Sequence, residues 1–190
     1  YSHAEGTGSI ASGTYGFAFG QSDTAASTVS VAMGASNKST GAYGFALGYK
    51  NITAYQSSVT MGQENKDTGW ASLASGIKNN IFNNVFYSNA FGLQNEIRAG
   101  QSSNLLGESN ILKSGRAHIL SGYANNIDAG NFISLFGTNN NAQGGNSHFA
   151  GGENNIIKSG NANSLLGRGN TADGSYLTAL GKDNIVYYQS

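Results

Sequence analysis

The chain has 190 residues, 28 of them glycine, with no proline and no cysteine, and its 10 Lys+Arg balance its 10 Asp+Glu. The balanced charge excludes the basic excess with which nucleic-acid-binding proteins neutralise phosphates. Zero cysteines exclude a disulfide-stapled scaffold and thiolate metal sites. Because no run approaches the roughly 18 apolar residues of a membrane helix, we expect no direct membrane contact in this segment.

A short apolar stretch closed by a glycine recurs along the whole chain. We call these glycines the anchor glycines, and every anchor from Gly34 onward has an asparagine three residues later. The predicted anchors are Gly13, Gly20, Gly34, Gly48, Gly62, Gly76, Gly92, Gly107, Gly122, Gly137, Gly152, Gly167 and Gly181. The asparagines that follow them are Asn37, Asn51, Asn65, Asn79, Asn95, Asn110, Asn125, Asn140, Asn155, Asn170 and Asn184.

The regular spacing from Gly20 onward predicts a narrow parallel β-solenoid, because one repeat is long enough for two short strands and two tight corners. Glycine and asparagine are expected at the corners because both tolerate left-handed backbone angles. Turns stacked about 4.8 Å apart would align the asparagines into a corner ladder of hydrogen-bonded amides.

Alternation along each strand predicts two different faces. The residue two before the anchor is small at first, as in Ala18 and Ala32, and often leucine later, as in Leu105, and we expect it to point into the solenoid. The large residues on either side of it are expected to point outward and pack against other copies of the chain in a closed oligomer. This predicted oligomer core comprises Phe17, Phe19, Val31, Met33, Phe45, Leu47, Val59, Met61, Phe91, Leu106, Phe136, Leu166 and Leu180.

The sequence resembles the YadA-like head domain of trimeric autotransporter adhesins from Gram-negative bacteria. The nearest match to that family's head strand is Val29-Ser30-Val31-Ala32-Met33-Gly34, with weaker matches over residues 44–48 and 57–62. The resemblance implies an all-β, left-handed parallel β-roll that assembles as a homotrimer on the bacterial cell surface, projecting from the outer membrane. It implies a single head domain over 1–190, with 14-residue repeats in 1–76, an irregular turn in 77–92, 15-residue repeats in 93–167 and the last turns in 168–190. We expect the segment to be head only, without the family's neck, stalk and membrane anchor.

The resemblance also implies a function. A non-catalytic adhesin head of this kind, associated with virulence, would bind a host cell receptor such as a carcinoembryonic-antigen-type adhesion molecule, or a matrix protein such as fibronectin, laminin or collagen. It would carry no cofactor and no metal. Two alternatives are a structural spacer whose fibre binds elsewhere, and a β-solenoid enzyme acting on glycans, which the lack of an evident carboxylate pair disfavours.

The irregular step between Gly76 and Gly92 is rich in aromatic side chains. Together with the nearby Trp70, the residues Phe82, Phe86 and Tyr87 are candidate partner-binding residues, because exposed aromatics are frequent anchors for protein partners. The alternative is a local packing adjustment where the shorter repeats meet the longer ones.

Three further sets of residues recur at fixed positions in the repeat, and each could contribute to binding or only to packing. His118 and His148 lie two turns apart, about 9.6 Å, which is too far to share a metal ion and favours ordinary packing inside the solenoid. An aromatic row, either a ligand platform or corner packing between chains, consists of Tyr15, Tyr43, Tyr87, Phe132 and Tyr176. A weakly basic edge, either solvated or facing an acidic partner, consists of Arg98, Lys113 and Lys158, interrupted by Asp128 and Gln143.

Overall fold

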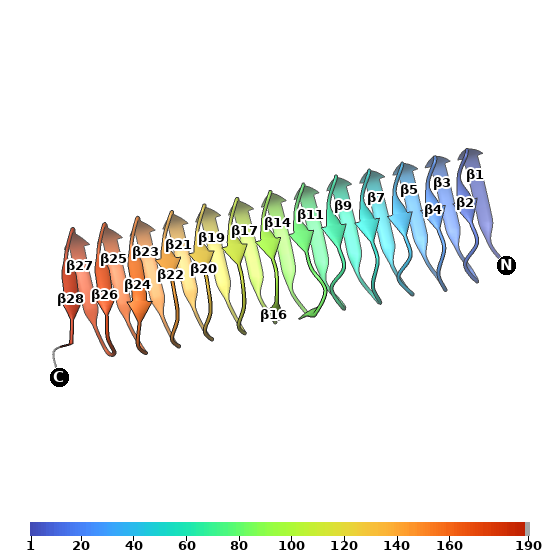
Figure 1. Cartoon of the computed structure of the whole chain (residues 1–190). Coiled ribbons are helices and arrows are strands. Elements are labelled where there is room, and N and C mark those ends of the chain that lie inside the picture. Colours follow the sequence, from blue (N-terminus) through green and yellow to red (C-terminus); the bar gives the residue numbers. More distant parts are fainter. Residues whose placement is uncertain (189–190) are drawn as a thin grey trace. The chain divides into compact units, whose positions relative to one another are not determined.

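The computed structural model describes residues 1–188, which form strands and no helix. The chain divides into two compact units, Tyr1–Gln94 and Asn95–Ser190, and each is a parallel β-solenoid (Figure 1). About 13 turns are present, so the prediction of an all-β parallel solenoid is confirmed. Within residues 1–188 no helix is long and apolar enough to cross a membrane.

Each turn combines a long strand of five residues with a short strand of two to four. The strands of the first unit are β1 (His3–Thr7), β2 (Ile10–Ala11), β3 (Phe17–Gln21), β4 (Thr24–Ala25), β5 (Val31–Ala35), β6 (Lys38–Ser39), β7 (Phe45–Tyr49), β8 (Ile52–Thr53), β9 (Val59–Gln63), β10 (Lys66–Asp67), β11 (Leu73–Ile77), β12 (Asn80–Ile81), β13 (Val85–Phe86) and β14 (Asn89–Leu93). The strands of the second unit are β15 (Glu96–Ile97), β16 (Gly100–Gln101), β17 (Asn104–Glu108), β18 (Ile111–Leu112), β19 (Ile119–Tyr123), β20 (Asn126–Ile127), β21 (Ser134–Thr138), β22 (Asn141–Ala142), β23 (Phe149–Glu153), β24 (Ile156–Ser159), β25 (Ser164–Arg168), β26 (Thr171–Asp173), β27 (Thr178–Lys182) and β28 (Ile185–Tyr187).

The anchor glycines stack on one another near the ends of the long strands. Gly34 pairs with Gly20 on one side and Gly48 on the other. Its φ is +125°, and an added Cβ would overlap the carbonyl oxygen of Gly48, so no other residue fits there. The predicted anchor Gly13 is wrong, because Gly6 pairs with Gly20 in the first turn. Each turn has two corners, half a turn apart, and both contain glycines. Gly13 belongs to the corner that precedes a long strand, not to the one that follows it.

The two corners of a turn differ in how much their length varies along the chain. The corner after a long strand, which we call the ladder corner, has two residues in the turns of both units, as in residues 50–51 and 109–110. The corner before the next long strand, which we call the second corner, has five residues in 54–58, seven in 82–88 and six in 113–118. The differences in turn length along the chain are therefore confined to the second corner.

The ladder corner is held by buried asparagine amides. In the second unit, the backbone N–H and the Nδ2 of Asn140 both donate to Oδ1 of Asn125, at 3.0 and 3.1 Å. Nδ2 of Asn140 also lies 3.0 Å from the carbonyl oxygens of Phe136 and Gly152. Oδ1 of Asn140 in turn accepts the N–H and Nδ2 of Asn155. Each amide is satisfied by the turns before and after it, as buried polar groups require.

The same pattern repeats in both units. The first unit places Asn37, Asn51, Asn65 and Asn79 in one such ladder, which begins with Asp23. The second unit places Asn95, Asn110, Asn125, Asn140, Asn155, Asn170 and Asn184 in another.

The predicted corner ladder of amides is confirmed, but the expected left-handed conformation of its asparagines is wrong. None of the ladder asparagines has a positive φ; the residue before each takes the left-handed conformation, as Ser36 (φ 58°) and Lys50 (φ 53°) do before Asn37 and Asn51. The asparagine is required for its amide, which bonds the neighbouring turns, and the left-handed position accepts serine, lysine, glutamate or alanine.

The interior is narrow, and several of the longer turns place larger side chains in it. In the first unit, small residues such as Ala32 and Ala46 of the long strands and Ser39 of a short strand are fully buried. In the second unit, Leu105 and Leu112 fill the equivalent positions. The extra residue at the second corner makes room for these larger side chains, and the predicted inward position is confirmed.

The large residues of the long strands lie on the outside of the chain. None of the thirteen residues of the predicted oligomer core is buried, and the exposed fraction reaches 43% at Phe19 and Leu106 and 64% at Leu180. Neighbouring rings such as Phe136 and Phe149 contact each other along this face. We call this row of outward apolar side chains the outer stripe.

Replacing a ladder asparagine tests how much the amide contributes. Asn140→Ala removes the Nδ2 donor to Asn125 and the Oδ1 acceptor of Asn155 inside the protein, and we expect it to lower the free energy of unfolding by about 3–5 kcal/mol in urea denaturation. Asn146→Ala, in the same turn, removes amide bonds to Asn131 and Asn161 that are exposed to water; it is the matched control and should cost within about 0.5 kcal/mol. Equal losses for the two variants would refute the ladder as the main support.

Candidate ligand-binding surface

A two-residue insertion reshapes the second corner of one turn in the first unit. Asp67 pairs with Ile81, fourteen residues later, whereas Trp70 forms a bridge with Phe86, sixteen residues later. The insertion therefore lies between Ile81 and Phe86, opposite Gly69 of the preceding turn. Asn84, inside it, takes a left-handed φ of 66°, which asparagine tolerates better than most residues.

The insertion brings three aromatic side chains together at this corner. The ring of Trp70 meets that of Phe86 edge-on, with centroids 5.7 Å apart and planes at 79°. The ring of Tyr87 lies 5.8 Å from Trp70 on a tilted plane. Trp70 is 36% exposed and Tyr87 57% exposed, so the cluster presents its surface to solvent while the rings fix one another.

A cavity of about 270 Å³ opens beside the cluster. It is lined by Tyr55, Thr68, Trp70, Asn83, Asn84, Val85 and Phe86. Tyr55 lies one turn before Gly69, and Asn83 and Asn84 lie one turn after it. Gly69 itself is buried against the interior, where an added Cβ would lie 2.8 Å from Oγ of Ser72 and 2.9 Å from the Ile81 side chain, so the corner packs closely beside the cavity.

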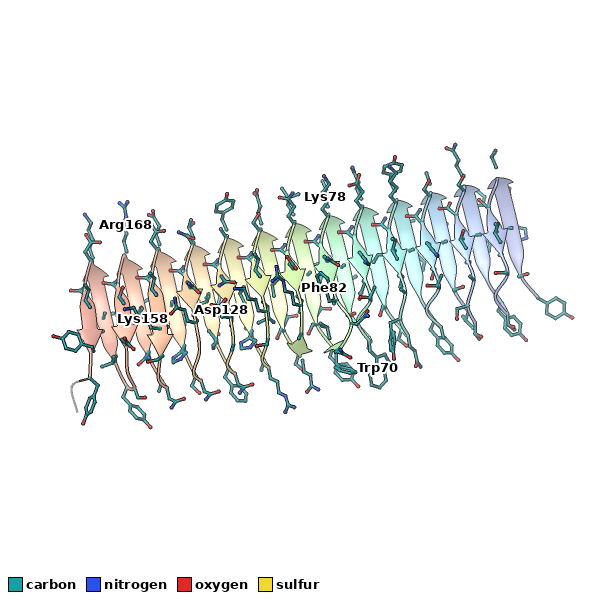
Figure 2. All side chains as sticks on the ribbon, in the orientation of Figure 1. Trp70, Lys78, Phe82, Asp128, Lys158 and Arg168 are labelled. Atoms are coloured by element: carbon teal, nitrogen blue, oxygen red, sulfur yellow. The ribbon has the colours of Figure 1, made fainter. Side chains whose placement is uncertain are left out.

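The four predicted partner-binding residues thus separate into a cluster and one outlier. Trp70, Phe86 and Tyr87 are together, whereas Phe82 follows β12 and is exposed on the face of the short strands. Figure 2 shows Trp70 at the edge of the solenoid formed by the second corners, Phe82 away from it, and Lys78 at the ladder corner on the opposite edge. Sequence reasoning missed Tyr55, Asn83 and Asn84, whose only signal was their distance of one turn from Gly69.

A buried carboxyl lies three residues before Trp70. Asp67 points into the solenoid at a position held by Ser39 and Thr53 in earlier turns, and it is fully buried. Its Oδ1 accepts the N–H of Gly69 at 2.9 Å and the hydroxyl of Ser72 at 2.6 Å, while Oδ2 has no partner within residues 1–188. Burial raises the pKa of Asp67 to about 7. Through these bonds Asp67 links the backbone of Gly69 to the side chain of Ser72, on either side of Trp70.

The two predicted histidines are part of the interior packing of the second unit. Nδ1 of His118 accepts the N–H of Ile133, and Nδ1 of His148 accepts the N–H of Asn163, both at 3.2 Å. Burial lowers the pKa of both imidazoles and so favours the neutral ring. Among residues 1–188, no group of three or more His, Asp or Glu side chains is placed to hold a metal ion.

The predicted basic edge is largely neutralised by its neighbours. Nζ of Lys113 lies 2.5 Å from Oδ1 of Asp128, and Nε of Arg98 lies 2.7 Å from Oε1 of Glu96. Figure 2 shows Asp128 and Lys158 on one face of the second unit. These exposed pairs leave little net positive charge to attract an acidic partner.

The predicted aromatic row is solvent-exposed throughout and lies at the second corners. All its members have a left-handed φ between 53° and 60°: Tyr15, Tyr43, Tyr87, Phe132 and Tyr176. Only Tyr87 belongs to the aromatic cluster described above.

No protein-family model matches the chain, and a search among curated proteins finds no match.

The raised pKa of Asp67 predicts a pH dependence of stability. Its folded pKa of about 7 exceeds the usual 3.8, so the native state binds more protons between these values and the free energy of unfolding falls as the pH rises from about 4 to 7. Asp67→Asn removes this ionisation, and we expect it to stabilise the chain at pH 8 by on the order of 2–4 kcal/mol. Thermal unfolding from pH 5 to 8 measures the effect.

Glu64→Gln is the control for that experiment. Glu64 is in the same unit and lies 3.7 Å from Lys78 in an exposed ion pair, which contributes little to stability. A pH dependence that is the same in Asp67→Asn as in the unchanged chain would contradict the assignment.

Proposed function

We propose that this chain is a non-catalytic head segment of a bacterial cell-surface adhesin, similar to the YadA-like heads of trimeric autotransporter adhesins, and that it binds a host receptor or matrix protein. The observation that carries the proposal is the exposed aromatic cluster of Trp70, Phe86 and Tyr87. Tryptophan and tyrosine are the residue types most enriched where binding energy concentrates. The regular turns around the cluster supply a rigid frame, so little conformational freedom is lost on binding.

Assembly as a homotrimer is part of this proposal. The outer stripe repeats apolar side chains from turn to turn, and apolar surface of this extent marks an association site. A closed symmetric oligomer covers such a stripe with the equivalent stripes of other copies. The number three and a left-handed winding come from the family resemblance, and both belong to the proposal.

Trimerisation would make adhesion multivalent. Three copies of one weak site raise the overall avidity without new contacts, provided that the sites reach the target surface together. The aromatic cluster is at the second corner and the outer stripe is on the long strands, so covering the stripe leaves the cluster accessible to a ligand.

A spacer role is the second candidate, and the same test distinguishes it. The purified chain is labelled and its binding to cultured human epithelial cells and to immobilised fibronectin, laminin and collagen is measured. We expect saturable binding to at least one surface, weakened at least about tenfold by Trp70→Ala, since hot-spot truncation costs about 2 kcal/mol or more. Binding to none of these surfaces would favour the spacer.

Two tyrosines in one register give a matched control. Tyr87 and Tyr43 are both exposed and both have a left-handed φ, but only Tyr87 contacts Trp70. We expect Tyr87→Ala to weaken binding and Tyr43→Ala to leave it unchanged. Equal effects of the two substitutions would show that the cluster does not form the binding surface.

A further inference from the structure

The cavity beside Trp70 combines aromatic walls with open amide groups. Trp70 and Phe86 meet at nearly a right angle and form one wall, and Tyr55 lies on the other side of Gly69. The side chains of Asn83 and Asn84 are exposed and have no hydrogen-bond partner within the described residues. Each amide therefore offers a donor group and an acceptor to a ligand.

No charged side chain lines this cavity. A phosphate, a carboxylate or another anion would lose its hydration on entering the cavity and would find no cationic side chain there, which is unfavourable. The volume of about 270 Å³ lies just below the roughly 300–1,000 Å³ of sites for drug-sized ligands, so the cavity suits a single ring rather than an extended chain. The ligand is therefore small, uncharged, apolar on one side and rich in hydrogen-bonding groups on the other.

We propose that this cavity binds one uncharged pyranose sugar, the terminal unit of a receptor glycan. The C–H groups on one face of the sugar ring pack on the indole of Trp70, whose ring face is electron-rich. The hydroxyl groups of the sugar, which both donate and accept, pair with the amides of Asn83 and Asn84. This inference rests on the proposed function, since it names the chemistry that the adhesin head recognises on its target.

The local backbone accounts for why the site occurs in this one turn. The two-residue insertion places Asn83 and Asn84 opposite Gly69, and the left-handed φ of Asn84 turns the chain back toward Phe86. Asp67 bonds the backbone N–H of Gly69 and the hydroxyl of Ser72, one on each side of Trp70. The shorter turns of the first unit have five residues at the second corner, as in 54–58, and lack this insertion.

The chain has one tryptophan, so its fluorescence reports directly on the cavity. We would titrate the full chain with the methyl glycosides of galactose, glucose, mannose, fucose, N-acetylglucosamine and N-acetylgalactosamine. We expect a saturable change with at least one of them, with a dissociation constant on the order of 1 mM, the scale that ligand-efficiency limits set for about 13 non-hydrogen atoms. No saturable change with any glycoside would overturn the inference, as would saturation by choline alone, which would indicate a cation site.

Variants at the amides test the proposed pairing. Asn83→Ala, and Asn84→Gly, which keeps the left-handed backbone accessible, should each raise the dissociation constant about tenfold, because a lost hydrogen bond leaves a sugar hydroxyl unpaired. Gln56→Ala, exposed on the same corner as Tyr55 but outside the cavity lining, should leave it unchanged. Unchanged affinity in both asparagine variants would overturn the pairing.

Binding to chemically or enzymatically treated cells distinguishes a failure of the sugar assignment from a failure of the proposed function. Periodate oxidation destroys sugar rings and leaves surface proteins in place, and we expect it to abolish the Trp70-dependent binding to cells. Binding that survives periodate but is lost after trypsin would overturn the sugar assignment in favour of a peptide ligand, with the adhesin function retained. Absence of binding both to untreated cells and to fibronectin, laminin and collagen would overturn the proposed function, and the glycoside titration would then judge the cavity independently.

Discussion

The buried asparagine ladder is the interaction on which the rest of the structure depends. Each ladder amide bonds the amides one turn before and one turn after it, as Asn140 does with Asn125 and Asn155. Adding a residue at the ladder corner would break this register, so that corner keeps two residues while the second corner ranges from four to seven. Variation in turn length, and with it the cavity beside Trp70, is therefore restricted to the second corner.

The narrow interior follows from the same constraint. Two strands joined by a two-residue corner lie close together, so positions such as Ala46 and Thr53 hold small side chains and most of the large apolar residues face outward. The second unit widens its interior with one more residue at the second corner and places Leu105 and Leu112 inside, yet Leu106 and Phe136 still face outward. The chain buries too little of its own apolar surface, which is why the proposed function includes a symmetric oligomer.

The repeat made much of the fold predictable. The period, the stacking of the anchor glycines and the inward position of residues such as Ala32 and Leu120 all follow from side-chain alternation and glycine spacing. The first anchor was misplaced because Gly6 and Gly13 lie half a turn apart and sequence alone does not tell one corner from the other. The left-handed positions were not predictable, because they are occupied by residues such as Ser36 and Lys50. Unlike glycine, these residue types do not indicate a left-handed conformation.

The candidate site was predictable only in part. Trp70, Phe86 and Tyr87 were conspicuous as aromatics beside the irregular step, but contact among them depends on where the two extra residues are inserted. Tyr55, Asn83 and Asn84 are ordinary corner residues until the register places them around Gly69. Asp67 was not expected inside the solenoid, because a carboxylate is costly to bury and the register holds serine or threonine in earlier turns.

The oligomeric state tests most directly whether the outer stripe completes the core. Light scattering coupled to size-exclusion chromatography gives the molar mass in solution without reference to shape. Under the proposal, the chain has three times its mass of 19.6 kDa, and Met61→Glu, which places a charge on the outer stripe, shifts it toward the monomer. A stable, folded species of 19.6 kDa at micromolar concentration would contradict the account.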